Sequence, residues 1–263
     1  MPALMFSRAA AAAIALCALA LPGHAGAQAS PLLVAAASDL RFALNELLEQ
    51  FSRETGIAAR AAYGASGNLA RQIEQGAPFE LFLSADEAFV LDLARKGLTR
   101  GEGELYAVGR IALFAPAGSA LTPDPELGDL RRRIAEGTLG RFAIANPEHA
   151  PYGRAAEQAL RSLELWEAVQ PALVLGENVA QAAQFAASGN AEGGIVAYSL
   201  VLAPQLAGRG AHALIPETLH APLRQRMVLT RHASTEAEAL YAHLRSASSR
   251  AVFARYGFTL PED

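Results

Sequence analysis

The chain has 263 residues, with 22 basic and 26 acidic side chains and a formal net charge of −4. Its one basic run, Arg131-Arg132-Arg133, has no interleaved aromatic residues, so we interpret it as a solvated helix surface and expect no nucleic-acid binding. A single cysteine, Cys17, excludes an internal disulfide, and the length allows one large α/β domain or two smaller lobes.

The first 27 residues have the pattern of a secretory signal peptide. Arg8 supplies a positive charge, residues 9–21 form an apolar stretch, and Ala25-Gly26-Ala27 matches an A-x-A cleavage site. The alternative is a transmembrane anchor, but the apolar stretch is short and runs directly into Pro22. We therefore expect residues 1–27 to be removed on export.

Strands alternate with helices along the rest of the chain. Apolar runs predict strands at 32–36, 57–63, 79–83, 111–115, 141–145, 172–175, 194–197, 211–215 and 227–229. Helical spacing of apolar residues predicts helices at 40–51, 69–75, 86–96, 153–163, 179–187 and 235–245, the last capped by Ser234. This alternation indicates an α/β fold in which mostly parallel sheets are flanked by helices.

The unit of strand, polar turn and helix recurs in both halves of the chain. We predict two lobes, with lobe 1 formed by residues 28–109 plus 222–263 and lobe 2 by residues 110–221. In sheets of this kind, ligands bind beyond the carboxyl ends of the strands. The sequence therefore predicts a ligand cleft between the lobes.

Four predicted helices begin at polar or glycine-containing turns. Ser38 and Ser66 precede the first two helices, Pro151-Tyr152-Gly153 precedes the fourth, and Gly176-Glu177-Asn178-Val179 precedes the fifth. The first N–H groups of a helix have no partner within it and attract anions. If the four starts converge, they form a site for a tetrahedral oxyanion without a counter-charge. The alternative for each serine is ordinary helix N-capping.

Six longer segments are informative together: AAAS (35–38), NLARQIEQGAP (68–78), LFLSAD (81–86), ANPEHAPYG (145–153), GENV (176–179) and RYGF (255–258). They resemble periplasmic molybdate-binding proteins of ABC transporters. The resemblance implies a two-lobed periplasmic binding protein that holds molybdate, and usually tungstate, in its cleft by hydrogen bonds alone. It also implies a membrane permease as partner, no cofactor and a periplasmic location, and we expect a monomer.

The same resemblance implies a set of site residues. Ser38 and Ser66 match serines that donate hydroxyl and backbone hydrogen bonds, and Val179 matches a valine that donates its backbone N–H. Either Tyr152 or Tyr198 matches the phenol donor of the family, and we favour Tyr152 because Tyr198 stands one place too late.

Asp39 departs from the family pattern. The family commonly has a neutral residue at this position, and a carboxylate would repel a dianion. We therefore expect its N–H to face the ligand and its side chain to turn away toward Arg41, which would leave a shell made only of donors.

Two other functions remain open from the sequence. One is a binding protein for another oxyanion such as sulfate, which has the same charge as molybdate and differs in size. The other is an exported serine hydrolase using Ser38 or Ser66, but no base partner is evident. Histidine and cysteine spacings predict no metal site. We expect a binding protein and not an enzyme.

Overall fold

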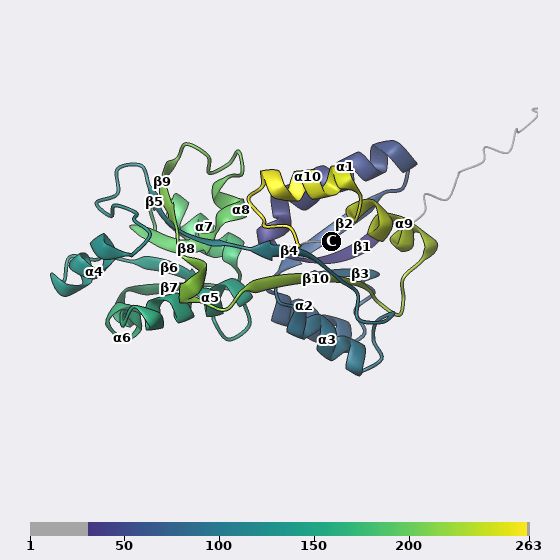
Figure 1. Cartoon of the computed structure of the whole chain (residues 1–263), viewed down its shortest axis with the longest axis horizontal. Coiled ribbons are helices and arrows are strands. Elements are labelled where there is room, and N and C mark those ends of the chain that lie inside the picture. Colours follow the sequence, from purple (N-terminus) through teal and green to yellow (C-terminus); the bar gives the residue numbers. More distant parts are fainter. Residues whose placement is uncertain (1–30, 262–263) are drawn as a thin grey trace, which may run out of the picture. The chain divides into compact units, whose positions relative to one another are not determined.

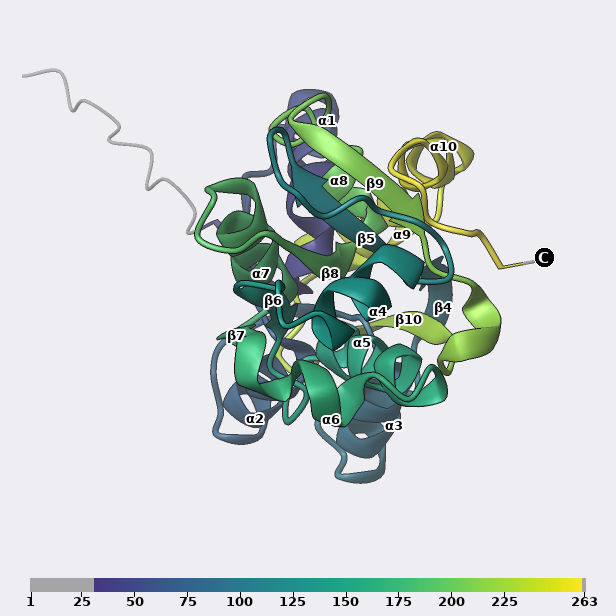
Figure 2. The same ribbon diagram turned by 90° about the vertical axis from the view of Figure 1, so that its left-hand side faces the viewer.

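The computed structural model describes residues 31–261, so the predicted signal peptide lies outside the described residues. This part of the chain contains two five-stranded sheets (Figure 1). The first sheet has the order β2 (Ala59–Gly64), β1 (Leu32–Ala37), β3 (Leu81–Ser84), β10 (Leu223–Leu229) and β4 (Glu104–Gly109). The second has the order β7 (Leu173–Gly176), β6 (Phe142–Ala145), β8 (Gly193–Ala197), β5 (Ile111–Pro116) and β9 (Gly210–Leu214), which Figure 2 shows in sequence.

Each sheet has four strands in one direction and one strand in the other. In the first sheet β10 is antiparallel to both neighbours, β3 and β4, while β1 is parallel to β2 and β3. In the second sheet β5 is antiparallel to β8 and β9, while β6 is parallel to β7 and β8. The predicted α/β fold with mostly parallel, helix-flanked sheets is confirmed.

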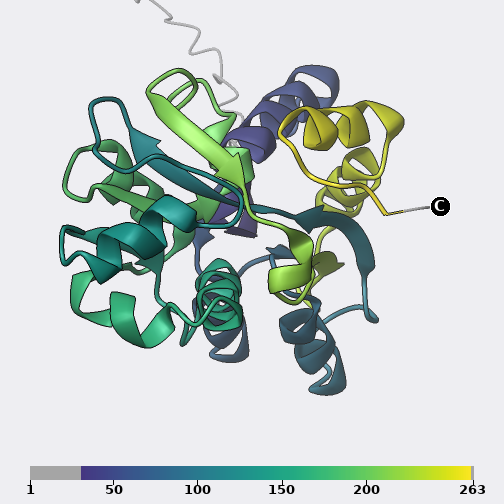
Figure 3. The ribbon, with the colours of Figure 1, turned by 60° about the vertical axis from the view of Figure 1, so that its left-hand side comes forward.

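Helices cover both faces of the first sheet. Successive residues of β1 alternate between two cores, because side chains of a strand point to opposite faces. Val34 and Ala36 pack with α1, α9 and α10, whereas Ala35 packs with α2 and α3. Figures 1 and 3 show these two helix groups on opposite sides of the sheet. The helices are α1 (Arg41–Thr55), α2 (Ser66–Glu74), α3 (Glu87–Arg95), α9 (Thr235–Leu244) and α10 (Ala247–Arg255).

One larger core surrounds the second sheet. It includes the apolar strand Ile111–Pro116, which is buried over nearly its whole length. This core also includes Ala37, Ala65 and Ala85, which lie at or just after the carboxyl ends of β1, β2 and β3. The two sheets are therefore in contact through these strand ends. The helices packed on this sheet are α4 (Gly128–Ala135), α5 (Pro151–Ser162), α6 (Trp166–Val169), α7 (Val179–Ala187) and α8 (Tyr198–Val201).

The chain passes between the sheets twice. Arg110 alone separates β4 from β5, and residues 215–222, which include the short helix η3 (Glu217–Leu219), connect β9 to β10. A second short helix, η2 (Gln170–Ala172), precedes β7, and a third, η1 (Ser38–Leu40), follows β1. The predicted lobe boundaries at 109/110 and 221/222 stay a prediction. Below, lobe 1 and lobe 2 denote the first and second sheets with their helices.

Candidate functional site: an oxyanion cavity at four helix starts

Residues from four helix starts line one small cavity of about 10 Å³. Lobe 1 contributes the starts of η1 and α2, and lobe 2 contributes the starts of α5 and α7. Each start follows the carboxyl end of a strand, which is where such sheets bind ligands. The lining residues are Ala37, Ser38, Asp39, Gly64, Ala65, Ser66, Ala85, Ala150, Pro151, Tyr152 and Val179.

Three of these helix starts have no side-chain cap. The N-cap residues of η1, α2 and α5 are Ala37, Ala65 and Ala150, and an alanine side chain cannot accept a hydrogen bond. Ser38 and Ser66 are the first residues inside their helices, so the N-capping alternative is wrong for both. First-turn N–H groups without a cap are suited to an anion.

The start of α7 differs because Asn178 caps it. The Asn178 side chain accepts hydrogen bonds from the N–H groups of Ala180 and Gln181, both at 3.1 Å. This cap leaves the N–H of Val179, the first helical residue, as the first-turn donor next to the cavity.

Both cavity serines use their oxygen as an acceptor. The hydroxyl oxygen of Ser66 accepts from the N–H of Ala85 at 3.0 Å, and that of Ser38 accepts from the N–H of Ala180 at 3.3 Å. A hydroxyl has one proton to donate as well as its acceptor sites. Because backbone donors already occupy an acceptor site on each oxygen, the two hydroxyl protons are the part of each group available to an oxyanion.

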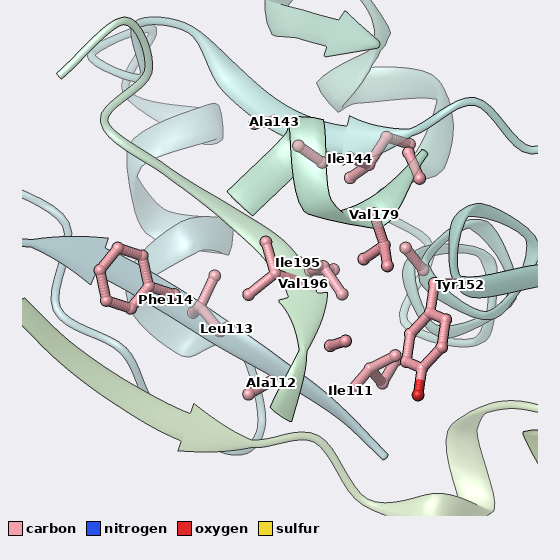
Figure 4. Close-up of a cluster of buried hydrophobic side chains, with 14 of the residues drawn as sticks. Ile111, Ala112, Leu113, Phe114, Ala143, Ile144, Tyr152, Val179, Ile195 and Val196 are labelled. Carbon is pink, nitrogen blue, oxygen red and sulfur yellow. The ribbon is translucent and has the colours of Figure 1, made fainter. Parts of the chain in front are cut away.

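A buried polar network crosses the site from lobe 2 to lobe 1. The Tyr152 hydroxyl donates to Oδ2 of Asp39 at 2.9 Å, and Nε2 of Gln225 donates to the same oxygen at 2.7 Å. Tyr106 completes the network by donating to Oε1 of Gln225 at 2.6 Å. Figure 4 shows the Tyr152 ring beside Val179, with its hydroxyl at the edge of the lobe 2 core.

The Asp39 side chain therefore does not point at Arg41, and that expectation is wrong. Hydrogen bonds to Tyr152 and Gln225 hold the carboxylate inside, while the Arg41 guanidinium lies over the Tyr63 ring, 5.5 Å from its centroid. Asp39 is one of the residues that line the cavity, and the expected donor-only shell stays a prediction.

Burial controls the protonation of this network. Desolvation raises the pKa of Asp39 to about 6, although the hydrogen bonds from Gln225 and Tyr152 lower it in part. Burial, together with the charge of Asp39, raises the pKa of the Tyr152 phenol well above its ordinary value. Tyr152 thus keeps its proton at neutral pH and donates a hydrogen bond to Asp39.

Tyr198 lies outside the cavity. Its N–H donates to the carbonyl of Arg110, and its ring packs against His212, with the centroids 5.7 Å apart. The structure thus brings together five of the six predicted site residues and places the sixth elsewhere. Gln225 and Tyr106 were not predicted as site residues. The only hint in the sequence was the position of Gln225, a polar residue just before the predicted strand at 227–229.

Direct contacts join the two lobes around the cavity. The N–H of Gly67 on α2 donates to the carbonyl of His149 at 3.1 Å. Arg154 on α5 forms an ion pair with Asp86 and lies over the Phe89 ring, 5.3 Å from its centroid. These contacts hold the helix starts of the two lobes against each other.

The geometry agrees with the comparisons with known proteins. Residues 32–259 match the model of a family described as bacterial extracellular solute-binding protein. The chain belongs to this family. It is 34% identical to the molybdate-binding protein ModA of Rhodobacter capsulatus, over 95% of this chain and 96% of the relative. It is 35% identical to ModA of Azotobacter vinelandii, over 89% of this chain and 92% of the relative.

A solved structure gives the same result. The periplasmic molybdate-binding protein of Azotobacter vinelandii superposes with a TM-score of 0.80 and 30% identity, covering 88% of this chain and all of that one. The resemblance predicted from the sequence segments is confirmed, and these relatives carry the names of binding proteins.

Residues 31–261 contain neither a candidate membrane-spanning helix nor a candidate metal-binding cluster. No helix in this range is long and apolar enough to cross a membrane. No group of three or more histidine, cysteine, aspartate or glutamate side chains in this range could hold a metal ion.

Proposed function

We propose that this chain captures molybdate, and also tungstate, in the periplasm and delivers it to the membrane permease of an ABC transporter. The observation that carries the proposal is the convergence of four helix starts, three of them without a side-chain cap, on one cavity with two serine hydroxyls. The names of its relatives, which align over nearly the whole chain, support molybdate as the ligand.

In this proposal the protein contacts the oxygens of the anion and not the metal. Ser38 and Ser66 donate their hydroxyl protons, and Val179 donates its backbone N–H. Each hydrogen bond to a charged group contributes roughly 1.5–3 kcal/mol. No resident cofactor is needed, because binding and release are the whole function.

Export and assembly are part of the same proposal. Residues 1–27 direct the chain through the inner membrane and are cleaved, and the mature protein acts as a monomer. At about 10 Å³ the cavity has room for about one water molecule, so the lobes must separate for the anion to enter. Opening and closure are a hinge motion about the two connections between the sheets.

The two alternatives are weaker on specific grounds. A serine hydrolase needs a base beside its nucleophile, whereas the hydroxyl oxygens of Ser38 and Ser66 accept from backbone N–H groups. A sulfate-binding protein would use the same donors, and only a comparison of anions separates it from the proposal.

Thermal melting and calorimetry with four oxyanions test the proposal. We expect molybdate and tungstate to raise the melting temperature and sulfate and phosphate to leave it nearly unchanged. A ligand at about a hundred times its dissociation constant adds roughly 2.7 kcal/mol to the free energy of unfolding, which is a shift of roughly 5–10 °C for a chain of this size. An equal shift with sulfate would contradict the selectivity, and no shift with any of the four would contradict the function.

A further inference from the structure

Asp39 has a buried carboxyl oxygen without a hydrogen-bond donor. The residue is 1% exposed and is one of those that line the cavity, next to Ser38. Oδ2 is saturated by Tyr152 and Gln225, but Oδ1 has no hydrogen-bond partner among residues 31–261. The backbone N–H groups of Asp39 and Leu40 lie close enough to lower its pKa, yet neither reaches hydrogen-bond geometry with Oδ1. An unpartnered carboxylate oxygen in a buried site disfavours the ionised form.

An oxyanion in a cavity lined by Asp39 brings further negative charge close to this carboxyl group. Two facing oxygens that carry only lone pairs repel each other, and a proton placed between them turns the repulsion into a charge-assisted hydrogen bond. A protonated carboxyl keeps Oδ2 as the acceptor for Tyr152 and Gln225 while Oδ1–H becomes a new donor.

We propose that Asp39 couples oxyanion binding to the uptake of one proton, which is held between Oδ1 and an oxygen of the bound anion. The inference rests on the proposed function, since it takes molybdate as the anion. The ionised carboxylate, the molybdate dianion and one proton from solvent combine into a complex with a net charge of −2 from these groups. One O–H bond forms on the carboxyl group, and no other covalent bond changes.

The protonation of the free protein supports this coupling. With a pKa of about 6, Asp39 is mostly ionised at neutral pH before the anion arrives. The negative charge of the anion then raises that pKa further, so protonation and binding favour each other by linkage.

Other groups around Asp39 do not titrate in its place. Tyr152 on α5 and Tyr106 on β4 face it directly, and burial raises both phenol pKa values well above 10. Arg224 and Arg226, which flank Gln225 on β10, form ion pairs with Glu87.

The elements that pack against η1 add few titratable groups. α7 has none, and α8 contributes Tyr198 against His212. At the ends of α1 and β2 next to η1 stand Arg41 and Tyr63, which stack on each other, and the other charged residues of these two elements are further along them. His149, which precedes the cavity residues Ala150 and Pro151, contacts the carbonyl of Glu177 at 3.0 Å and is the histidine to control for.

Asparagine at position 39 imitates the proton-loaded state. Its amide oxygen can accept from Tyr152 and Gln225 as Oδ2 does, and its NH₂ group stands where Oδ1 needs a proton. Asp39→Asn therefore supplies a hydrogen-bond donor to the anion without taking up a proton from solvent.

Calorimetric titration of molybdate between about pH 6 and pH 8.5, in buffers of different ionisation enthalpy, tests the coupling. For the natural protein we expect uptake of about one proton per molybdate at pH 8, and an affinity that tightens about tenfold per pH unit lowered until it levels off near pH 6. For Asp39→Asn we expect no proton uptake, no pH dependence and an affinity at pH 8 about a hundredfold tighter than that of the natural protein. His149→Gln and the exposed control Asp92→Asn should both keep the natural slope.

The outcomes separate this inference from the proposed function. Tight molybdate binding by the natural protein with no pH dependence and no proton uptake overturns the coupling and leaves the function standing. Loss of the slope in His149→Gln, or its persistence in Asp39→Asn, also overturns it. Absence of molybdate binding by both the natural protein and Asp39→Asn at every pH overturns the function and the coupling together. Proton uptake is measured on the natural protein itself, so the test does not depend on the folding of a variant.

Discussion

At the scale of single residues, Ser66 offers the cleanest test of the cavity. Ser66→Ala should weaken molybdate binding roughly ten- to hundredfold, because it removes a hydroxyl donor worth roughly 1.5–3 kcal/mol to a charged acceptor. Ser249→Ala is the matched control: this serine is equally buried and donates to the carbonyl of His243 on the far side of lobe 1. Calorimetry should find the affinity of the control unchanged, and an unchanged affinity for Ser66→Ala would remove this serine from the site.

The two tyrosines are separated by removing one hydroxyl at a time. Tyr152→Phe keeps the ring but removes the phenol that orients Asp39. At about pH 5, where Asp39 is mostly protonated with or without this hydrogen bond, molybdate affinity should therefore fall roughly tenfold or more. Tyr198→Phe should leave the affinity unchanged, since its ring packs against His212 outside the cavity. Titration of both variants decides the question. The reverse pattern would return the phenol role to Tyr198.

Asp39 also makes stability depend on pH. Its pKa is raised by folding from 3.8 to about 6, so the folded state holds this proton more tightly than the unfolded state. The free energy of unfolding should therefore fall as pH rises from about 4 to about 6 and stay lower above that, by an amount on the order of 3 kcal/mol.

Urea unfolding of the ligand-free protein measures this effect. Asp39→Asn should raise the free energy of unfolding at pH 8 and change it little at pH 4. The exposed variant Asp92→Asn should not raise it at either pH, because ion pairs with Lys96 and Arg95 favour the charge of Asp92. A gain for Asp39→Asn that is equal at both pH values would show that its origin is not the buried charge.

Some cavity residues could be predicted from the sequence and others could not. Ser38, Ser66 and Val179 could be placed because each stands at a strand-to-helix turn, which is a local feature. The partners of Asp39 could not, because Tyr152 and Gln225 are 113 and 186 residues away in the chain and meet it only after the sheets form. Whether a carboxylate turns inward depends on such distant partners and not on its neighbours in sequence.

At the scale of elements, the prediction succeeded where periodicity was clean. The helix predicted at 179–187 is α7 as observed, and Ser234 caps α9 by accepting from the N–H of Ala237. Strand β10 was predicted only at 227–229 but begins at Leu223. Its buried Gln225, between two arginines, breaks the apolar alternation that would have revealed the strand. Strand β4 and helices α6, α8 and α10 were also outside the predicted ranges, and of α4 only the basic run at 131–133 was interpreted as helical.

The N–H of Val179 can be removed without breaking its helix. Proline is tolerated at the first helical position, and Asn178 already has the extended backbone that proline requires before it. Val179→Pro should therefore leave the fold intact and weaken molybdate binding roughly tenfold or more, through loss of one charged hydrogen bond. Thr235→Pro, at the first position of α9 after the extended Ser234, is the control and should bind as the natural protein does. Equal affinities for the two variants would exclude the Val179 N–H as a donor.

At the scale of the whole described chain, the alternation of strands and helices was enough to predict two helix-flanked sheets. The reversed strand in each sheet was not predictable in this way. β5 and β10 are the strands by which the chain enters one sheet directly from the other, and each of them runs against its neighbours. Strand direction there is set by the crossing between sheets, for which local sequence carries no signal.

The contact between α2 and the His149 segment makes closure of the two lobes testable with one methyl group. A Cβ on Gly67 would lie 2.9 Å from the carbonyl oxygen of His149 in lobe 2, too close for the lobes to keep their present contact. It would also lie 3.1 Å from the end of the Phe89 ring within lobe 1, where the ring must shift by a few tenths of an ångström. The position is otherwise suited to alanine, because Gly67 is helical and Gly→Ala in a helix is stabilising by roughly 0.4–1 kcal/mol. Gly67→Ala should therefore leave the ligand-free melting temperature nearly unchanged while it weakens molybdate binding and speeds release.

Gly128→Ala is the control, since a Cβ at this helix start would meet Asp124 only at 3.6 Å, an ordinary contact. Small-angle scattering with molybdate should show the Gly67 variant more extended than the control, and a variant as compact and as tight-binding as the control would show that closure does not depend on this contact.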